Sequence, residues 1–140
     1  MRNRDIELLL PQRDPFLFVD ELISVDRQQV VGSMTYDDEF PYYQESLSQQ
    51  RVVPPMLLVE SLVQCGGAGA TRLGVTQRIP WGLAALQQVE FFDAVEANST
   101  LRMVVQNRRL SSRLIKQAGT SFCGDRIVLQ ASWFCVPFTK

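Results

Sequence analysis

The sequence predicts an α+β domain in which a β-sheet wraps around one long helix. The stretch "MLLVESLV", residues 56–63, is apolar around almost the whole circumference of a helix, and we expect such a helix to be buried on all sides. From residue 81 to residue 136, apolar residues instead recur at every second position, as is typical of strands. In 140 residues, a sheet curved around the helix is the simplest way to bury it, and we expect a single domain over residues 1–140.

The long helix is expected from Met56 to about Leu73. Pro55 suits its first turn, where a missing N–H costs no hydrogen bond, and Gly74 is a natural stop. The helix contains an unusual small-residue run, "GGAGA" over residues 66–70. Because glycine inside a helix costs roughly 0.5–1 kcal/mol relative to alanine, we expect another backbone or a ligand to approach closely at this run.

The remaining elements follow from strand-forming residues and turn signals. A short helix is expected over Asp5–Leu10, and residues 37–50 are expected to form a loop with one short helical turn. The expected strands are Phe16–Val25, Gln29–Tyr36, Trp81–Phe92, Ser99–Leu110, Ser112–Cys123 and Arg126–Val136, with a turn at Cys123–Arg126. In the last strand, one face is expected to carry Ile127, Leu129, Ala131, Trp133 and Cys135.

Composition and charge exclude several classes of partner. The net charge of −1 provides no general attraction to nucleic acid or to an anionic membrane. No apolar run reaches the roughly 20 residues of a membrane-spanning helix, and the first residues do not resemble a secretory signal. We therefore expect a cytoplasmic protein without nucleic-acid or membrane partners.

The cysteines and the missing histidines argue against metal and thiol chemistry. Cys65, Cys123 and Cys135 are odd in number and contain no CxxC pair, so neither a disulfide framework nor a zinc site is indicated. The chain contains no histidine that would activate a cysteine nucleophile. We expect each cysteine to act as a small buried hydrophobe, and we expect no metal and no cofactor.

Glu60 is the one acidic residue in the apolar part of the long helix. Burial without a partner would raise the pKa of such a carboxyl group, so we expect Glu60 to face a cleft or a buried polar contact. Gln64 lies one turn further on the same face and is within hydrogen-bonding reach. This pair would serve a structural role as readily as a catalytic one.

Three separated segments carry a family resemblance: "LLPQRDPFLFVD" (residues 9–20), "FPYYQES" (40–46) and "VPPMLLVESLVQCGG" (53–67). They resemble L-P-H-R-Y-P-F-L-x-V-D, F-F-x-G-H-F-P-G and M-P-G-V-L-x-x-E-A-L-A-Q of the hot-dog-fold (3R)-hydroxyacyl-ACP dehydratases of the FabZ and FabA type. The similarity extends over nearly the whole chain, and its spacing is more specific than one short motif.

The resemblance implies a hot-dog fold, a curved antiparallel sheet around a central helix, and a homodimer with an acyl-chain tunnel at its interface. It implies the elimination of water from a 3-hydroxyacyl thioester carried by acyl carrier protein (ACP) or by CoA, as in fatty-acid or polyketide metabolism. In that family, a histidine removes the α-proton, and a glutamate from the partner subunit's helix protonates the departing hydroxyl. A glycine N–H at the start of the helix holds the thioester carbonyl.

Compared position by position with the family pattern, this chain matches two functional residues and departs from it at two others. Glu60 falls on the glutamate and Gln64 on its companion, whereas the histidine falls on Ser46 and the glycine on Pro55, which has no N–H. A positioned base typically contributes about 10²–10⁴-fold to the rate, and one oxyanion donor about 10²–10³-fold. The resemblance therefore implies a divergent member whose dehydratase chemistry is impaired or depends on a partner subunit.

Three functions remain open at this point. In the first, the chain is a non-catalytic or partner-dependent hot-dog protein, which binds an acyl chain or its carrier, or forms a mixed dimer in which Glu60 serves a histidine-bearing relative. Alternatively, it is itself a dehydratase or hydratase that uses Glu60. A third possibility is an acyl thioesterase in which Glu60 activates water.

Overall fold

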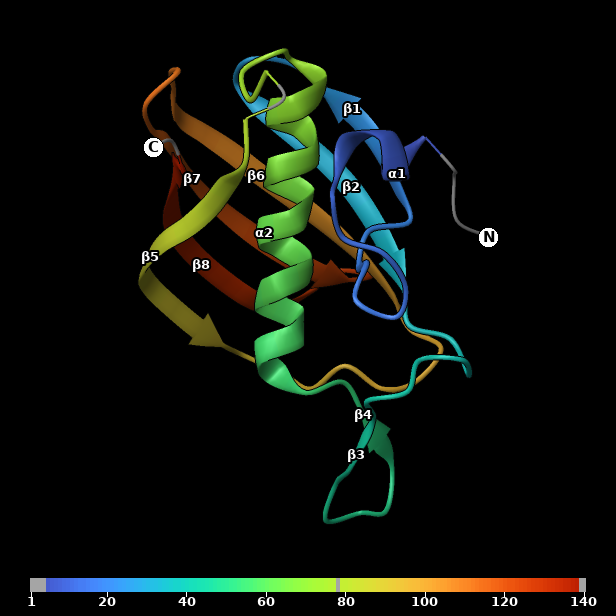
Figure 1. Ribbon diagram of the computed structural model, residues 1–140. Coiled ribbons are helices and arrows are strands. Elements are labelled where there is room, and N and C mark those ends of the chain that lie inside the picture. The colour runs from blue at the N-terminus through green and yellow to red at the C-terminus, as the bar shows by residue number, and fades with distance from the viewer. Residues whose placement is uncertain (1–4, 78, 139–140) are drawn as a thin grey trace.

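The computed structural model describes residues 5–77 and 79–138. Six antiparallel strands form one sheet in the order β1-β2-β6-β7-β8-β5, and this sheet curves around helix α2 (Figure 1). The elements are α1 (Ile6–Leu9), β1 (Glu21–Val25), β2 (Gln29–Thr35), β3 (Gln44–Glu45), β4 (Arg51–Val52), α2 (Pro55–Arg72), β5 (Trp81–Phe91), β6 (Thr100–Leu110), β7 (Ile115–Cys123) and β8 (Arg126–Pro137). The predicted sheet around one long helix is confirmed.

Helix α2 begins and ends as the sequence predicts. Pro55 is its first residue, and Gly74 follows its end with a φ of 80°. The N–H of Gly74 donates to the carbonyl of Thr71, and the N–H of Val75 donates to the carbonyl of Ala70. The left-handed backbone at Gly74 thus closes the helix and pairs carbonyls that would otherwise be left open.

The helix is not buried on all sides, and here the sequence-based expectation was wrong. Its sheet-facing residues, such as Leu58 and Leu62, are buried, but eight positions are half-buried or exposed, and five of them lie on one side of the helix. At about 100° per residue, these five positions lie within an arc of about 80°. We call this arc the open stripe; its members are Met56, Glu60, Val63, Gly67 and Thr71. Six strands of a single chain wrap most of the helix but leave this stripe uncovered.

Two glycines of the small-residue run let the sheet approach the helix. A Cβ at Gly66 would collide with the side chain of Gln117 on β7, and a Cβ at Gly69 would collide with Val30 on β2. The sheet does approach closely at these two positions, but the approaching groups are side chains and not the backbone or ligand that the sequence led us to expect. At Gly67, in contrast, a Cβ would meet only Leu10, at an ordinary 3.8 Å.

Several element boundaries differ from the prediction. The expected first strand begins only at Glu21, because the N–H and the carbonyl of Phe18 bond to side chains of α2 rather than to a neighbouring strand. The expected loop of residues 37–50 contains β3, which pairs with β4, in place of a helical turn. Strand β7 begins at Ile115, because Ser111 and Leu114 close the turn before it.

The inward face of β8 also differs at one end. Leu129, Ala131 and Trp133 are buried as predicted, but Ile127 is 39% exposed and Val128 is buried instead. The register between β7 and β8 shifts at Ser121/Phe122, which turns the start of β8 over. A bulge of this kind reverses the inside–outside pattern, and period-two reasoning cannot foresee it.

The cysteines are free, and Cys65 is fully buried, whereas Cys123 and Cys135 are half-buried. None of the described helices is long and apolar enough to cross a membrane.

Candidate functional site

Glu60 lies on the open stripe of α2, half-buried, with its side chain held by Gln64. The Gln64 Nε2 donates to Glu60 Oε2 at 3.0 Å, and Gln64 itself is 2% exposed. The polar contact that the sequence predicts for Glu60 is therefore confirmed. One carboxylate oxygen is fixed by a buried amide, and this contact orients the carboxylate without adding a charge next to it.

Gln64 is in turn fixed by the segment before β1. Its Oε1 accepts a hydrogen bond from the Phe18 N–H at 2.8 Å, and its Nε2 also donates to the Phe16 carbonyl at 3.1 Å. The Ser61 hydroxyl donates to the Phe18 carbonyl. Residues 16–18 thus lie strapped along α2, and the strap immobilises the amide that orients Glu60.

The charge of Glu60 is felt by a thiol on the sheet. Burial, together with the nearby Glu60 carboxylate, raises the pKa of Cys135 to about 11. Burial is also the main reason why the pKa of the Tyr36 hydroxyl is raised, with Asp20 and Glu60 contributing in the same direction. Neither the Cys135 thiol nor the Tyr36 hydroxyl therefore ionises near neutral pH.

Ser46 lies in the turn of the β3–β4 hairpin, which extends away from the sheet beyond the start of α2 (Figure 1). Its hydroxyl lies 2.9 Å from that of Ser48 and accepts the Gln50 N–H at 3.1 Å. These contacts are those of a loop hydroxyl that closes a tight turn. The structure does not bring Ser46 and Glu60 of one chain together.

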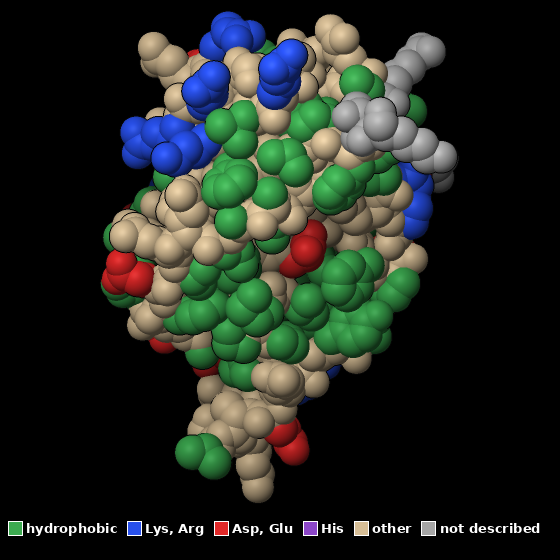
Figure 2. Space-filling model, turned by 60° about the vertical axis from the view of Figure 1, so that its left-hand side comes forward, with side chains coloured by type: hydrophobic (Ala, Val, Ile, Leu, Met, Phe, Trp, Pro, Cys, Tyr) green, Lys and Arg blue, Asp and Glu red, His purple; other side chains and the backbone are tan. Residues whose placement is uncertain are grey.

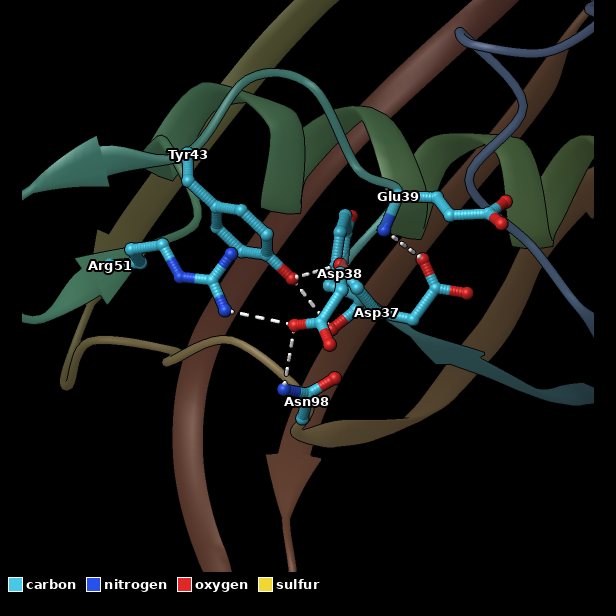
Figure 3. A network of polar contacts seen from close by, with 7 residues as sticks. Asp37, Asp38, Glu39, Tyr43, Arg51 and Asn98 are labelled. Atoms are coloured by element: carbon cyan, nitrogen blue, oxygen red, sulfur yellow. Dashed lines mark hydrogen bonds and ion pairs between the residues drawn. The ribbon is translucent and has the colours of Figure 1, made fainter.

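A polar network anchors the base of this hairpin (Figure 3). Arg51 donates to Asp38 at 2.9 Å and lies 4.9 Å from the centre of the Tyr43 ring. Asn98 also donates to Asp38, at 3.1 Å, and the Tyr43 hydroxyl reaches the carbonyls of Tyr36 and Asp37. The hydrogen bonds from Arg51 and Asn98 hold the pKa of Asp38 below its usual value. These contacts connect the hairpin, which has only two residues in each strand, to the loops that carry Asp38 and Asn98.

Pro55 opens α2 and supplies no N–H, and Pro54 before it supplies none either. The Leu57 N–H donates to the Pro54 carbonyl at 2.9 Å. The first amide of the helix is consequently that of Met56, on the open stripe.

The face that carries the open stripe is largely apolar. Figure 2 shows hydrophobic side chains gathered on this face, with Lys and Arg concentrated at one end. Strand β5 is last in the sheet order, so one of its edges has no neighbouring strand among the residues that the structure describes. Large apolar side chains are exposed on both elements: Met56 by 57%, Leu83 by 43% and Phe91 by 46%. An open strand edge beside an exposed apolar stripe is suited to pairing with another chain.

Sequence reasoning found Glu60 and Gln64 but missed the groups that position them. Nothing in a period-two or period-3.6 pattern places Ser61 against the strap or Cys135 near Glu60, because both contacts join elements far apart in the chain. Gly67 was included in the small-residue run, but its difference from Gly66 and Gly69 depends on the sheet. Among the described residues, no three His, Cys, Asp or Glu side chains lie where they would hold a metal ion.

Comparison with known sequences identifies relatives along almost the whole chain. Residues 10–132 match the FabA-like domain. The FabZ 3-hydroxyacyl-acyl-carrier-protein dehydratase of Pelotomaculum thermopropionicum is 28% identical over 127 residues, covering 90% of this chain and 91% of that protein. The FabZ of Xanthomonas oryzae pv. oryzae is 29% identical over 135 residues, covering 93% of this chain and 88% of that protein.

Solved structures share the fold at low sequence identity. The dehydratase heterocomplex ApeI:P from Xenorhabdus doucetiae superposes with a TM-score of 0.81 at 14% identity, covering 96% of this chain and 91% of that one. A hypothetical thioesterase with coenzyme A from Streptococcus pneumoniae superposes with a TM-score of 0.65 at 11% identity, covering 86% of each chain. These similarities confirm the predicted hot-dog fold.

Proposed function

Because the chain belongs to the family of FabA-like domains, we propose that it is the histidine-lacking subunit of a mixed hot-dog dimer that dehydrates 3-hydroxyacyl thioesters. In this dimer, Glu60 protonates the departing hydroxyl, while a histidine of the partner subunit removes the α-proton. The thioester is carried by ACP or CoA.

The observation that carries this proposal is that Glu60 is held in place without a histidine in its own chain. Gln64 and the strap fix the carboxylate on the open stripe, yet the chain contains no histidine to work with it. Partial burial of the Glu60 carboxylate costs desolvation free energy. Its presence at this position therefore favours an interaction with a group from outside the chain. The open edge of β5 and the exposed apolar side chains on the same face favour a second hot-dog chain as the source of that group.

The positions of Ser46 and Pro55 determine how the two sites of such a dimer differ. The site that contains Glu60 receives the partner's histidine, and its first helix amide is Met56 N–H because Pro55 has none. The other site would receive Ser46, which cannot act as a base near neutral pH without help. We therefore propose one working site per mixed dimer. The heterocomplex named for the neighbour from Xenorhabdus doucetiae is consistent with this arrangement.

Complementation tests the proposal directly. A histidine-bearing FabZ-type dehydratase from the same cell is inactivated by replacing its own helix glutamate with glutamine, and is then co-expressed with this chain. We expect the purified pair to interconvert 3-hydroxyacyl and 2-enoyl pantetheine thioesters, because Glu60 meets the intact histidine. Turnover should fall about 10²–10⁴-fold when this chain carries Glu60→Gln, and a partner lacking its histidine should give none.

Three outcomes would refute the proposal. The first is the absence of a mixed dimer, and the second is a dimer whose turnover does not depend on Glu60. The third is turnover by this chain alone: enoyl formation would make it a self-sufficient dehydratase, and release of free thiol would make it a thioesterase.

A further inference from the structure

Helix α2 covers one face of the sheet (Figure 1), and the opposite face carries a depression of about 580 Å³. Its lining residues come from the five neighbouring strands β2, β6, β7, β8 and β5. Most of these residues alternate along their strands with residues that pack against the helix, such as Val30 and Gln117. The proposed dimer uses the other side of the sheet and the edge of β5, so this outer face remains available.

The depression is a trough that follows β7. Its floor is formed by Ala118 and Thr120, which are small and half-buried. The register places the longer side chains of Gln106 on β6 and Gln130 on β8 beside these two residues. Gln106 is drawn away from the floor, because its Nε2 donates to Gln29 Oε1 on β2 at 2.9 Å. A floor of short side chains between longer ones therefore gives the trough its depth.

Charge is depleted in the middle of the trough and present at its ends. Two rows of the register cross the five strands, and Glu90, on the last strand of the sheet, is the one charged residue among these described positions. Arg102 and Arg108 lie beyond the two rows, at opposite ends of the trough. Neither arginine forms an ion pair with a residue that the structure describes. A charge-depleted centre within a charged rim is typical of a surface that binds another protein.

The two arginines make the ends of the trough suited to carboxylates. The Arg102 guanidinium lies over the Phe122 ring, 4.6 Å from its centre. This contact occupies one face of the guanidinium and leaves the N–H groups, which lie in its plane, available to a carboxylate. Arg108 lies six residues further along β6, which is about 20 Å at about 3.3 Å per residue.

These dimensions favour an extended peptide as the occupant. Strands β6 and β8 lie two strand spacings apart, about 9.5 Å, whereas a helix with its side chains is about 10–12 Å wide. An extended segment of six residues is about 20 Å long and fits lengthwise. Its backbone amides can bond to the walls, because a glutamine side chain both donates and accepts. Among the described residues, the side-chain amides of Gln88 and Gln130 have no other hydrogen-bond partner.

We propose that the trough binds an extended acidic segment of a partner protein, with one carboxylate on Arg102, a second on Arg108, and small uncharged residues over β7. The Glu90 carboxylate repels a further acid in the middle of the segment, so it selects for this spacing. The proposal is independent of the proposed function, because the trough and α2 lie on opposite faces of the sheet. It gives the chain a second binding surface that remains accessible in the mixed dimer.

Fluorescence anisotropy with two labelled hexapeptides tests the proposal. The first peptide has a glutamate at each end and alanine, serine and threonine between them. The second has the same composition, with the two glutamates adjacent at one end. We expect the first peptide to bind about tenfold more tightly, because only this peptide reaches both arginines with charge-assisted hydrogen bonds. Its affinity should fall as the ionic strength rises.

Three variants locate the bound peptide. Arg102→Ser removes one end charge and Ala118→Phe fills the floor, and each should weaken binding of the first peptide about tenfold or more. Arg113→Ser removes the same charge at an exposed position before β7 and should leave the affinity unchanged. Far-UV circular dichroism checks folding, and Arg102→Ser decides if Ala118→Phe does not fold.

Three results would overturn the proposal. The first is no binding of the first peptide at about 1 mM. The second is equal binding of the two peptides, and the third is an equal loss of affinity in Arg102→Ser and Arg113→Ser. Either of the last two results would show a general attraction between charges and not a site that measures the distance between two carboxylates.

Discussion

Substituting alanine for two glycines of one helix isolates the packing of the sheet against α2. Gly67→Ala and Gly69→Ala gain the same intrinsic helix propensity, about 0.5–1 kcal/mol. The difference between their free energies of unfolding therefore reports only what the new methyl group contacts. At Gly67 that contact is Leu10, at an ordinary 3.8 Å, so this variant should be more stable than the wild type by about 0.5–1 kcal/mol.

At Gly69, the methyl group would collide with Val30, which is fully buried. Val30 cannot easily turn away, because β-branched side chains are stiff at χ1 and because its strand pairs on both sides with β1 and β6. Overpacking of this kind typically costs about 1–3 kcal/mol. Gly69→Ala should therefore be less stable than Gly67→Ala by this amount, and close to or below the wild type.

Urea unfolding, followed by far-UV circular dichroism at one protein concentration, measures both changes. For a protein of this length, 1 kcal/mol corresponds to a shift of about 2–4 °C in Tm, so thermal melts provide a second reading. Equal m-values are required before the free energies are compared. If both variants change the free energy of unfolding by the same amount, contact between Val30 and Gly69 does not limit the approach of β2 to the helix.

Three further predictions concern the site and its hairpin. Gln64→Leu leaves the buried Phe18 N–H without an acceptor, so the free energy of unfolding should fall by about 1–3 kcal/mol. Gln87→Leu, at an exposed position, is the matched control. An equal effect in the two variants would show that the hydrogen bond between the strap and Gln64 does not stabilise the fold. The lowered pKa of Asp38 means that its ion pair stabilises the hairpin above the unfolded pKa of about 4 and is lost as pH falls through the lower folded pKa. The protection factors of the backbone amides of residues 44–52 against hydrogen exchange should fall in that acidic range, and Asp38→Asn should abolish this pH dependence of the protection factors. Cys135, with a pKa raised to about 11, should react with iodoacetamide at pH 8 about 100-fold more slowly than an unperturbed thiol. Glu60→Gln removes the nearby negative charge and should increase the rate of Cys135 alkylation, which mass spectrometry measures. An unchanged rate would show that the Glu60 carboxylate does not act on this thiol.

Glu60 shows how much of the candidate site a sequence can reveal. An acid within an apolar helical run is unusual enough to be noticed, and Gln64 follows from the periodicity of a helix alone. The strap does not follow, because its contacts with α2 join segments more than 40 residues apart. Contacts of that kind are set by how the sheet curves, which local patterns do not encode.

The open stripe gives a similar contrast. Its residues read as part of an all-round apolar helix, and the sequence therefore predicted complete burial. Six strands cover most of the circumference of α2 but not all of it, and the arc left open contains Glu60 and Gly67. An apolar pattern specifies that a surface will be covered, without specifying whether its own chain or another chain covers it.

The sequence by itself determined the helix, its two ends, most strand positions and the identity of the central acid, because each depends on residues close together in the chain. Only the tertiary structure decided which of three neighbouring glycines faces the sheet and which faces outward. It also decided that Ser46 lies on a projecting hairpin away from Glu60, and that β8 turns over at Ile127. The physical reason is the same in each case: a packed contact depends on two surfaces, and a local sequence pattern describes only one of them.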